Sequence, residues 1–265
     1  MMLTFDPNHY LNEVILVGCG GTGAVWANGI ARIIRMMKDT GKSIPHIKFI
    51  DPDHFEVKNV GRQLVQDVSI GENKAVELAR RFNMTLGLCI EAIPESFDPK
   101  KHVTRYSGTI ICGAVDNWRA RQAISEAEGA IWIDCGNARY NGQVVIGSTS
   151  DTEMMQSRLK SMKPDVTTLH WLPNAAAVYP ELLKPDPEDE RLAQTLSCAE
   201  LLERSLQSAT INGFMANIAT EYLRKMLYRD PIKSWITHID TTTLNMRSTP
   251  ITLDNIIQSL PNLAS

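Results

Sequence analysis

Paired cysteines are missing from this sequence. Its 265 residues include five cysteines, and no two of them form a Cys-x-x-Cys spacing. Neither a disulfide framework nor a zinc site built from paired Cys-x-x-Cys motifs is therefore expected. Most of the cysteines lie in apolar or glycine-rich stretches, which suits reduced thiols in a cytoplasmic protein.

Long apolar runs and an excess of basic residues are also missing. No segment approaches the roughly 18 apolar residues of a membrane-spanning helix, and the N-terminus has neither the basic start nor the apolar core of a signal peptide. Lys and Arg number 27 against 30 Asp and Glu, for a net charge of −3. Because nucleic-acid-binding domains are usually basic, neither a nucleic acid nor a membrane is expected as a partner. The balance of 43% hydrophobic and 22% charged residues indicates a globular protein with a sizeable core.

The sequence does contain an alternation of short apolar runs and helix-like segments. The expected strands are 14–17, 47–50, 88–93, 109–115 and 131–134, and the expected helices are 24–38, 73–82 and 117–128. This alternation favours a parallel sheet with right-handed crossovers. Further short strands are expected at 143–147, 235–240 and 241–248. The predicted fold class is α/β, a Rossmann-like, mostly parallel sheet with a few antiparallel strands added at one edge.

The chain is expected to form a single domain over residues 1–265, in three parts. A core over 12–148 precedes an irregular crossover or lid over 149–196, in which five of the 13 prolines gather. Loops of that length are usually functional or disordered. Residues 197–265 should then form C-terminal helices, with a break near Asn212-Gly213, and a strand pair.

Four glycines stand between the first expected strand and the first expected helix: Gly18, Gly20, Gly21 and Gly23. Glycine in this place permits a tight turn and lets the N–H groups of a helix N-terminus approach a phosphate. A tight turn without a ligand is the alternative, but the flanking strand and helix favour nucleotide binding. No Lys-Ser or Lys-Thr pair follows, so this is not a Walker P-loop, and the glycines alone do not distinguish NAD from ATP.

Acidic residues close the second expected strand, where a Rossmann-like fold holds a ribose. Asp51 occupies this place, and a helix cap or turn is its alternative role. Asp53 follows two residues later, where a turn and a binding role are equally well supported.

A set of cationic, amide and acidic side chains then favours a triphosphate over a dinucleotide. The set comprises Asn59, Arg62, Gln63, Lys74, Asp116 and Asn117. A hydride-transfer enzyme that binds a pyrophosphate needs no such set around its glycine loop. Arg62 and Lys74 would neutralise β- and γ-phosphate charge, and Asp116 would hold magnesium directly or through water. ATP with magnesium is therefore the expected ligand.

These motifs, in this order, resemble those of the ThiF/MoeB/HesA family, the adenylyltransferases of the ubiquitin-activating type. The matching pieces are Gly18–Gly23, Asp51-Pro-Asp53, Asn59-Val-Gly-Arg62-Gln63, Lys74, Asp116-Asn117 and Ala138-Arg-Tyr-Asn-Gly-Gln143. The resemblance extends over 12–148 and is weaker over 197–230, where Cys198 precedes a helix with Asn212. Within the family the sequence is most similar to the ThiF-like protein of the PRTRC gene cluster.

The resemblance implies transfer of AMP from magnesium-bound ATP to the C-terminal glycine carboxylate of a ubiquitin-like protein, with release of pyrophosphate. It implies that the glycine loop cradles the phosphates, that Asp51 holds the ribose and that Asp116 serves magnesium. It further implies that the triphosphate is lined by Asn59, Arg62, Gln63 and Lys74. The catalytic residues that it implies are Arg62, Lys74 and Asp116. Cys198 either forms a thioester or persulfide with the activated partner or is a structural cysteine at a helix start. A conjugating-type partner protein and a homodimer are also implied.

The sequence departs from the family pattern in two respects. It lacks the family's zinc-binding Cys-x-x-Cys pairs, so no zinc is expected, and the residues before the first strand hold no arginine that reaches a partner protomer's ATP. Candidates to replace that arginine are Arg32, Arg119, Arg121 and Arg139. Three alternatives remain: a tRNA-borne or peptide carboxylate as acceptor, a non-catalytic nucleotide-binding scaffold subunit, and an NAD-dependent oxidoreductase.

Overall fold

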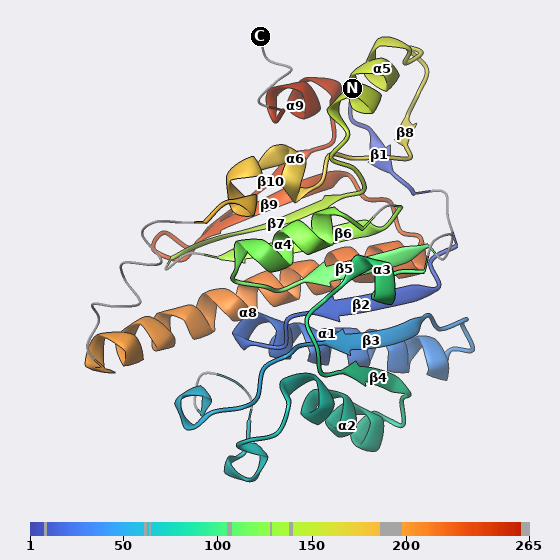
Figure 1. Cartoon of the computed structure of the whole chain (residues 1–265). Coiled ribbons are helices and arrows are strands. Elements are labelled where there is room, and N and C mark those ends of the chain that lie inside the picture. The colour runs from blue at the N-terminus through green and yellow to red at the C-terminus, as the bar shows by residue number, and fades with distance from the viewer. Residues whose placement is uncertain are drawn as a thin grey trace.

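The computed structural model describes residues 1–7, 10–60, 63, 65–104, 108–127, 129–137, 140–185 and 198–260, and only the backbone of 198–208. An eight-stranded sheet with helices on both faces forms most of this part (Figure 1). No helix within it combines the length and the apolar character needed to cross a membrane.

The large sheet is parallel over five strands and antiparallel over three. Its strand order is β10-β9-β7-β6-β5-β2-β3-β4. The parallel strands are β2 (Glu13–Val17), β3 (His46–Ile50), β4 (Ile90–Ile93), β5 (Thr109–Gly113) and β6 (Ile131–Asn137). The antiparallel strands at one edge are β7 (Asn141–Gly147), β9 (Ser234–Asp240) and β10 (Asn245–Pro250). The predicted fold class is confirmed, although β10 begins later than expected because a turn precedes it.

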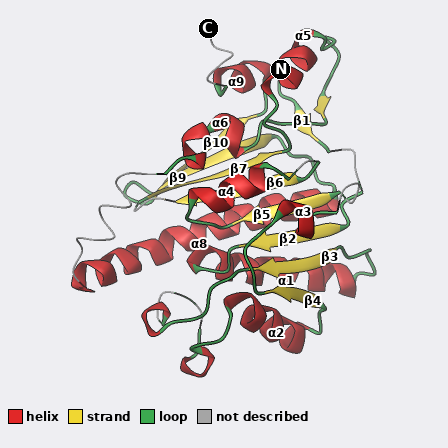
Figure 2. Ribbon diagram, viewed as in Figure 1, coloured by secondary structure: helices red, strands yellow, loops and turns green. Residues whose placement is uncertain are grey.

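Helices cover both faces of the sheet, as Figure 2 shows. On one face lie α1 (Gly21–Asp39) and the long α8 (Cys198–Tyr228), which pack against each other. The other face carries α4 (Trp118–Ser125) and α6 (Ala175–Val178), while α2 (Lys74–Leu86) packs against β3 and β4. The shorter elements are η1 (Val57–Asn59), η2 (Asp67–Ser69), α3 (Pro99–His102), α5 (Thr152–Lys160), η3 (Pro180–Leu183) and α9 (Leu253–Gln258).

The break predicted near Asn212-Gly213 is wrong, because α8 runs through both residues without interruption. Ile211, Met215 and Ala216 are fully buried around this point. A glycine in a helix interior costs only about 1 kcal/mol relative to alanine. Burial of three apolar side chains against α1 and the sheet outweighs that cost.

The crossover expected to be irregular contains regular structure up to residue 185. Besides α5, α6 and η3 it holds β8 (Thr168–Leu169), which pairs in parallel with the N-terminal β1 (Thr4–Phe5) in a separate two-stranded sheet. Trp171 and Leu172 are buried in the core. The described part of the crossover therefore packs onto the domain, and residues 186–197 lie outside the described part.

Strand burial explains why the site forms where it does. Every residue of β2 and β5 is buried, as in a parallel sheet covered on both faces. Polar loops can then collect only at the ends of these strands. The segments that follow β2, β3, β5 and β6 share one edge, the carboxyl edge at which α/β proteins bind ligands.

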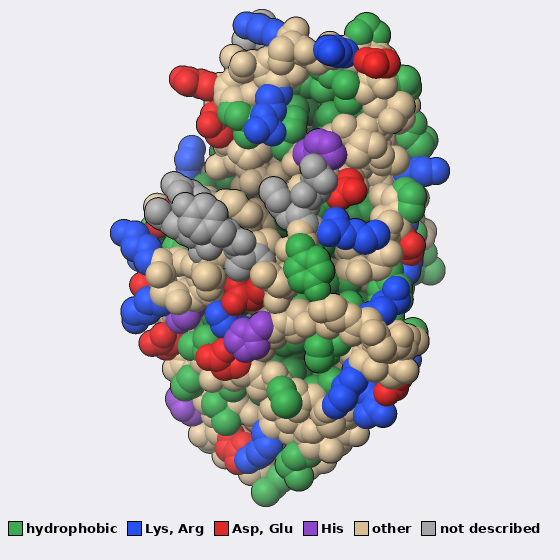
Figure 3. Space-filling model, turned by 90° about the vertical axis from the view of Figure 1, so that its right-hand side faces the viewer, with side chains coloured by type: hydrophobic (Ala, Val, Ile, Leu, Met, Phe, Trp, Pro, Cys, Tyr) green, Lys and Arg blue, Asp and Glu red, His purple; other side chains and the backbone are tan. Residues whose placement is uncertain are grey.

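Charge on the outer surface shows no strong bias where it can be seen. The right-hand side of the molecule, which faces the viewer in Figure 3, carries acidic and basic side chains interspersed with one another. This mixture agrees with the net charge of −3.

Candidate functional site

The glycine loop joins β2 to α1 and requires glycine at two points. Gly18 has a φ of +88°, and a Cβ built on it would lie 2.5 Å from the carbonyl oxygen of Ala114. A Cβ on Gly23 would lie 1.9 Å from the carbonyl oxygen of Gly18. Because both neighbours are backbone atoms, no side chain can be accommodated. The loop is thereby pressed against the end of β5.

The N-terminus of α1 carries no side-chain cap. Gly20 is the N-cap residue, no side chain of the described residues caps the first N–H groups, and the first turn contains no acidic residue. The unpaired N–H groups of a 19-residue helix and its dipole favour an anion at this point. This geometry is compatible with the phosphate binding that the glycines predict, which stays a prediction.

Asp51 lies directly after β3 and is turned toward the loop. Its Oδ2 accepts a hydrogen bond from the Cys19 N–H at 2.5 Å, and its Oδ1 accepts one from the Asp53 N–H at 2.8 Å. The side chain is only 5% exposed, and this burial raises the pKa of Asp51, although the two N–H groups act against the shift. Asp51, which was predicted to bind the ribose, therefore also holds the glycine loop in place from the neighbouring strand β3.

Lys74 and Asp53 form an ion pair beside Asp51. Lys74 opens α2 and is buried, and its Nζ lies 3.0 Å from Asp53 Oδ2. The Asp53 side chain is 66% exposed, so the buried partner is the cation. In this structure Asp53 neutralises the positive charge of Lys74, which was expected to contact a triphosphate.

Asn73 was not among the predicted site residues, yet it joins the two segments just described. Its Nδ2 donates to the backbone oxygens of Asp51 (2.8 Å) and Asp53 (3.0 Å), and its Oδ1 accepts from Val76 N–H as the N-cap of α2. The signal available in the sequence was an asparagine as the first residue of the expected helix 73–82, a position typical of an N-cap.

Three further site residues were predicted in the segment after Asp53, and the structure describes two of them, Asn59 and Gln63. Asn59 is buried, and its Oδ1 accepts from the Glu56 N–H at 2.8 Å, so its side chain builds the η1 turn. The Gln63 N–H donates to the Asn59 carbonyl at 3.0 Å. Arg62 lies outside the described residues.

Asp116 and Asn117 follow β5 at the same edge as the glycine loop. Asp116 is exposed, whereas the Asn117 Oδ1 accepts from Ala120 N–H at 2.9 Å and caps α4. In the described part of the chain, no cluster of three or more His, Cys, Asp or Glu side chains could hold a metal by itself. A carboxylate such as Asp116 is the oxygen ligand that magnesium prefers, and phosphate oxygens would complete the shell.

The candidate replacement arginines differ in their surroundings. Arg121 is buried, with its Nε 3.5 Å from the fully buried Asp134, and Arg119 stacks on Trp118 at 4.6 Å from the ring centroid. Arg32 is exposed on α1, and Arg139 lies outside the described residues. Cys198 is the first residue of α8, but its side chain is likewise not described.

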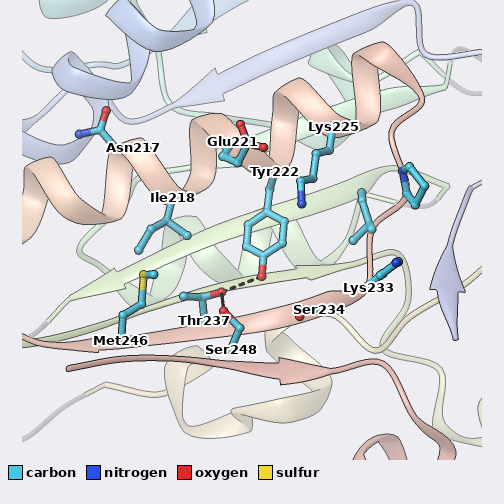
Figure 4. Close-up of a pocket in the computed structure, with 12 residues that line it drawn as sticks. Asn217, Ile218, Glu221, Tyr222, Lys225, Lys233, Ser234, Thr237, Met246 and Ser248 are labelled. Carbon is cyan, nitrogen blue, oxygen red and sulfur yellow. Dashed lines mark hydrogen bonds between the residues drawn. The ribbon is translucent and has the colours of Figure 1, made fainter. Parts of the chain in front are cut away.

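A cavity of about 420 Å³ lies elsewhere, between α8 and the strands β9 and β10 (Figure 4). The Tyr222 hydroxyl bonds to Thr237 Oγ1 at 2.7 Å, and Thr237 bonds in turn to Ser248 Oγ at 2.9 Å. None of the residues predicted to bind nucleotide lines this cavity.

The fold defines a Rossmann-like α/β protein whose glycine loop and uncapped helix N-terminus lie at the carboxyl edge of its parallel strands. The profile of the ThiF family matches residues 11–256, and the chain belongs to this family.

Solved structures of low sequence identity share the fold. The chain matches PaaA with a TM-score of 0.54 and 17% identity, covering 91% of this chain and 64% of PaaA. It matches E. coli MccB solved with ATP with a TM-score of 0.56 and 14% identity, covering 90% of this chain and 64% of that one. It also matches the microcin C7 biosynthetic enzyme MccB in complex with N-formylated MccA, with a TM-score of 0.54 and 14% identity, covering 92% and 65% of the two chains. The chain thus spans less than two thirds of the length of these proteins. No curated protein matches the sequence.

Proposed function

We propose that the protein is an ATP-dependent adenylyltransferase that activates the C-terminal glycine carboxylate of a ubiquitin-like protein. The single observation that carries this proposal is the uncapped N-terminus of α1, flanked at one sheet edge by Asp51 and the buried Lys74. Membership of the ThiF family and the fold shared with MccB, which is solved with ATP, support it. The whole chain, residues 1–265, would serve as one cytoplasmic adenylation domain.

The proposed reaction needs little from a general base. A carboxylate is already ionised at pH 7, so its oxygen can attack the α-phosphorus directly. The bond from that phosphorus to the bridging oxygen of pyrophosphate breaks, and an acyl-adenylate forms. The chain's task is to position the two reactants in line and to stabilise the charge that develops on the leaving pyrophosphate.

Several of the predicted residues have a place in this scheme. The N–H groups of the glycine loop would hold phosphate oxygens, and Asp51 would accept from the ribose hydroxyls. Lys74 would exchange its partner Asp53 for the triphosphate, and Arg62 would add a second cation. Asp116 would hold magnesium, which supplies further neutralisation of phosphate charge when it is bound. A homodimer, a conjugating-type partner and a later thioester or sulfur transfer at Cys198 belong to the same proposal.

A different acceptor is the second candidate, because MccB, which shares the fold, is solved with MccA. A peptide or tRNA-borne carboxylate would react by the same steps. A scaffold without catalysis fits less well, since Lys74 and Asp116 are both present at the site edge.

The test is ATP–pyrophosphate exchange with magnesium, with and without candidate ubiquitin-like proteins that end in glycine. Exchange that depends on one such protein would support the proposal and identify the partner. Measurable ATP binding with exchange that depends on a short peptide instead would favour the second candidate. A Cys198→Ala variant that retains exchange but forms no thioester would separate the two chemical steps.

A further inference from the structure

We infer that Asn212 of α8 is a positioning residue that locks the N-terminus of α1 to the end of β6, and that it thereby sets the phosphate end of the nucleotide site. This inference rests on the proposed function. It assigns a role to the middle of α8, which none of the residues predicted to bind nucleotide occupies.

Asn212 accepts two hydrogen bonds at one oxygen. Thr22, in the first turn of α1, donates its hydroxyl to Asn212 Oδ1 at 2.9 Å. Asn137, the last residue of β6, donates its Nδ2 to the same oxygen. The two donors come from segments more than 100 residues apart in the sequence. The Asn212 side chain of α8 is hydrogen-bonded to both of them.

The nitrogen of the same amide lies against the glycine loop. A Cβ built on Gly21 would lie 2.4 Å from Asn212 Nδ2. Gly21 is therefore glycine because Asn212 fills the space that a side chain would need. A side chain at position 21 would have to displace the Asn212 amide from this place.

The packing of α8 restricts the movement of the Asn212 side chain. Its own side chain is 8% exposed, and its neighbours Ile211, Met215 and Ala216 are fully buried. A side chain held in this way has few alternative rotamers, so it transmits the position of the helix to the groups that it binds.

The two segments that Asn212 joins enclose the strand that leads to Asp116. In the sheet, β5 lies between β2, which feeds the glycine loop, and β6, which ends at Asn137. Neighbouring strands are about 4.8 Å apart, so the loop and the β6 end are separated by roughly 10 Å. Asn212 bridges that span on the α8 face and so fixes the width of the site at its phosphate end.

The test compares the affinities of purified variants for magnesium-ATP and for adenosine. Asn212→Ala should weaken magnesium-ATP by about tenfold or more, because small misplacements of binding groups are costly. Adenosine, which lacks phosphates, should bind within twofold of wild type. Thr22→Val should weaken ATP binding in the same direction, because it removes one of the two hydrogen bonds at Asn212 Oδ1. The double variant should bind ATP no more weakly than Asn212→Ala alone, because that hydrogen bond is already absent there.

Two further variants keep the test decisive. Thr220→Ala loosens another contact between α8 and α1, since Thr220 Oγ1 lies 2.2 Å from a Cβ built on Gly29, and it should leave both affinities unchanged. Asn137→Ala changes an exposed residue and probes the same contact if Asn212→Ala does not fold.

Three outcomes decide between the claims. Selective loss of ATP affinity in Asn212→Ala, Thr22→Val or Asn137→Ala supports the inference. Unchanged ATP affinity in these variants, or equal loss of ATP and adenosine affinity, overturns it while leaving the proposed function standing. Failure of the wild-type protein to bind magnesium-ATP overturns the proposed function instead.

Discussion

The carboxylate of Asp51 accepts a hydrogen bond from the backbone N–H of Cys19, so the strand β3 holds the glycine loop of β2 in place. A buried carboxylate between two N–H donors is an arrangement with little freedom, since Asp51 Oδ1 is bound by Asp53 N–H as well. The residue expected to bind the ribose therefore also shapes the phosphate loop. Nucleotide affinity and loop geometry should respond together when it is changed.

Asp51→Asn tests this dual role. The variant keeps one acceptor oxygen but turns an NH₂ group toward a backbone N–H, which leaves a buried donor without a partner at a cost of about 1–3 kcal/mol. We expect a lower free energy of unfolding by that amount in urea, together with at least tenfold weaker ATP binding by calorimetry. A variant with normal stability and normal ATP affinity would contradict both roles.

Asp53→Ala distinguishes a binding role for Asp53 from its observed pairing with Lys74. The Asp53 side chain is largely exposed, whereas the Lys74 ammonium with which it pairs is buried. Removing it frees the Lys74 ammonium, so magnesium-ATP should bind as tightly as to wild type or more tightly. Lys74→Met, measured beside it, should weaken ATP by at least tenfold. Weaker ATP binding by Asp53→Ala would instead assign Asp53 to the nucleotide.

Two glycine variants separate packing from ligand approach in the loop. Gly23→Ala places a Cβ 1.9 Å from a backbone oxygen, and overpacking of this kind costs about 1–3 kcal/mol of stability. A Cβ on Gly20 meets nothing within 4 Å, so Gly20→Ala should unfold like wild type. If a phosphate approaches the loop, Gly20→Ala should still weaken ATP binding. Normal ATP affinity in a stable Gly20→Ala protein would place the phosphate elsewhere.

The buried pair of Arg121 and Asp134 predicts a pH dependence. Burial raises the pKa of Asp134, and the Arg121 guanidinium opposes that shift. In Arg121→Met the opposition is lost and the pKa of Asp134 rises further, so the folded variant takes up a proton more readily than the unfolded chain. Its stability should therefore be low at neutral and alkaline pH and should recover as the pH falls through the raised pKa.

Urea unfolding of Arg121→Met across pH 5.5 to 8.5 checks this behaviour. Breaking a buried pair costs about 3–5 kcal/mol, and we expect a deficit of that size at pH 7 that shrinks on acidification. The double variant Arg121→Met with Asp134→Asn removes the titrating carboxyl and should lose the pH dependence of the deficit. A deficit that stays constant with pH would show that Asp134 does not carry the effect.

The sheet could be predicted from the sequence because its signals are local. Apolar runs such as 14–17 and 109–113 are buried on both faces. The turn expected at Asn141-Gly142 is wrong, because both residues already belong to β7, the first antiparallel strand. The short helix α5 escaped detection, since nine residues rich in charge give a weak periodic signal. The unbroken course of α8 was also missed, because its stability at Gly213 comes from tertiary burial rather than from local propensity.

The candidate site was predictable only where its residues belong to motifs that recur in a fixed order along the chain. The glycine loop, Asp51 and Lys74 follow known spacings along the sequence. The bond between Thr22 and Asn212 joins residues 190 positions apart, and the pair of Arg121 and Asp134 joins a helix to a strand. Contacts of this kind depend on how the elements pack, and no spacing in one sequence reveals them.

ATP–pyrophosphate exchange tests the central claim most directly. The assay would use wild-type protein, magnesium-ATP and candidate ubiquitin-like proteins, each with a free and with an amidated C-terminal glycine. We expect exchange with one free carboxylate, its loss on amidation, and its loss in Arg62→Ala and Asp116→Ala. Exchange that survives amidation, or that Arg62→Ala and Asp116→Ala both retain in full, would contradict the central claim.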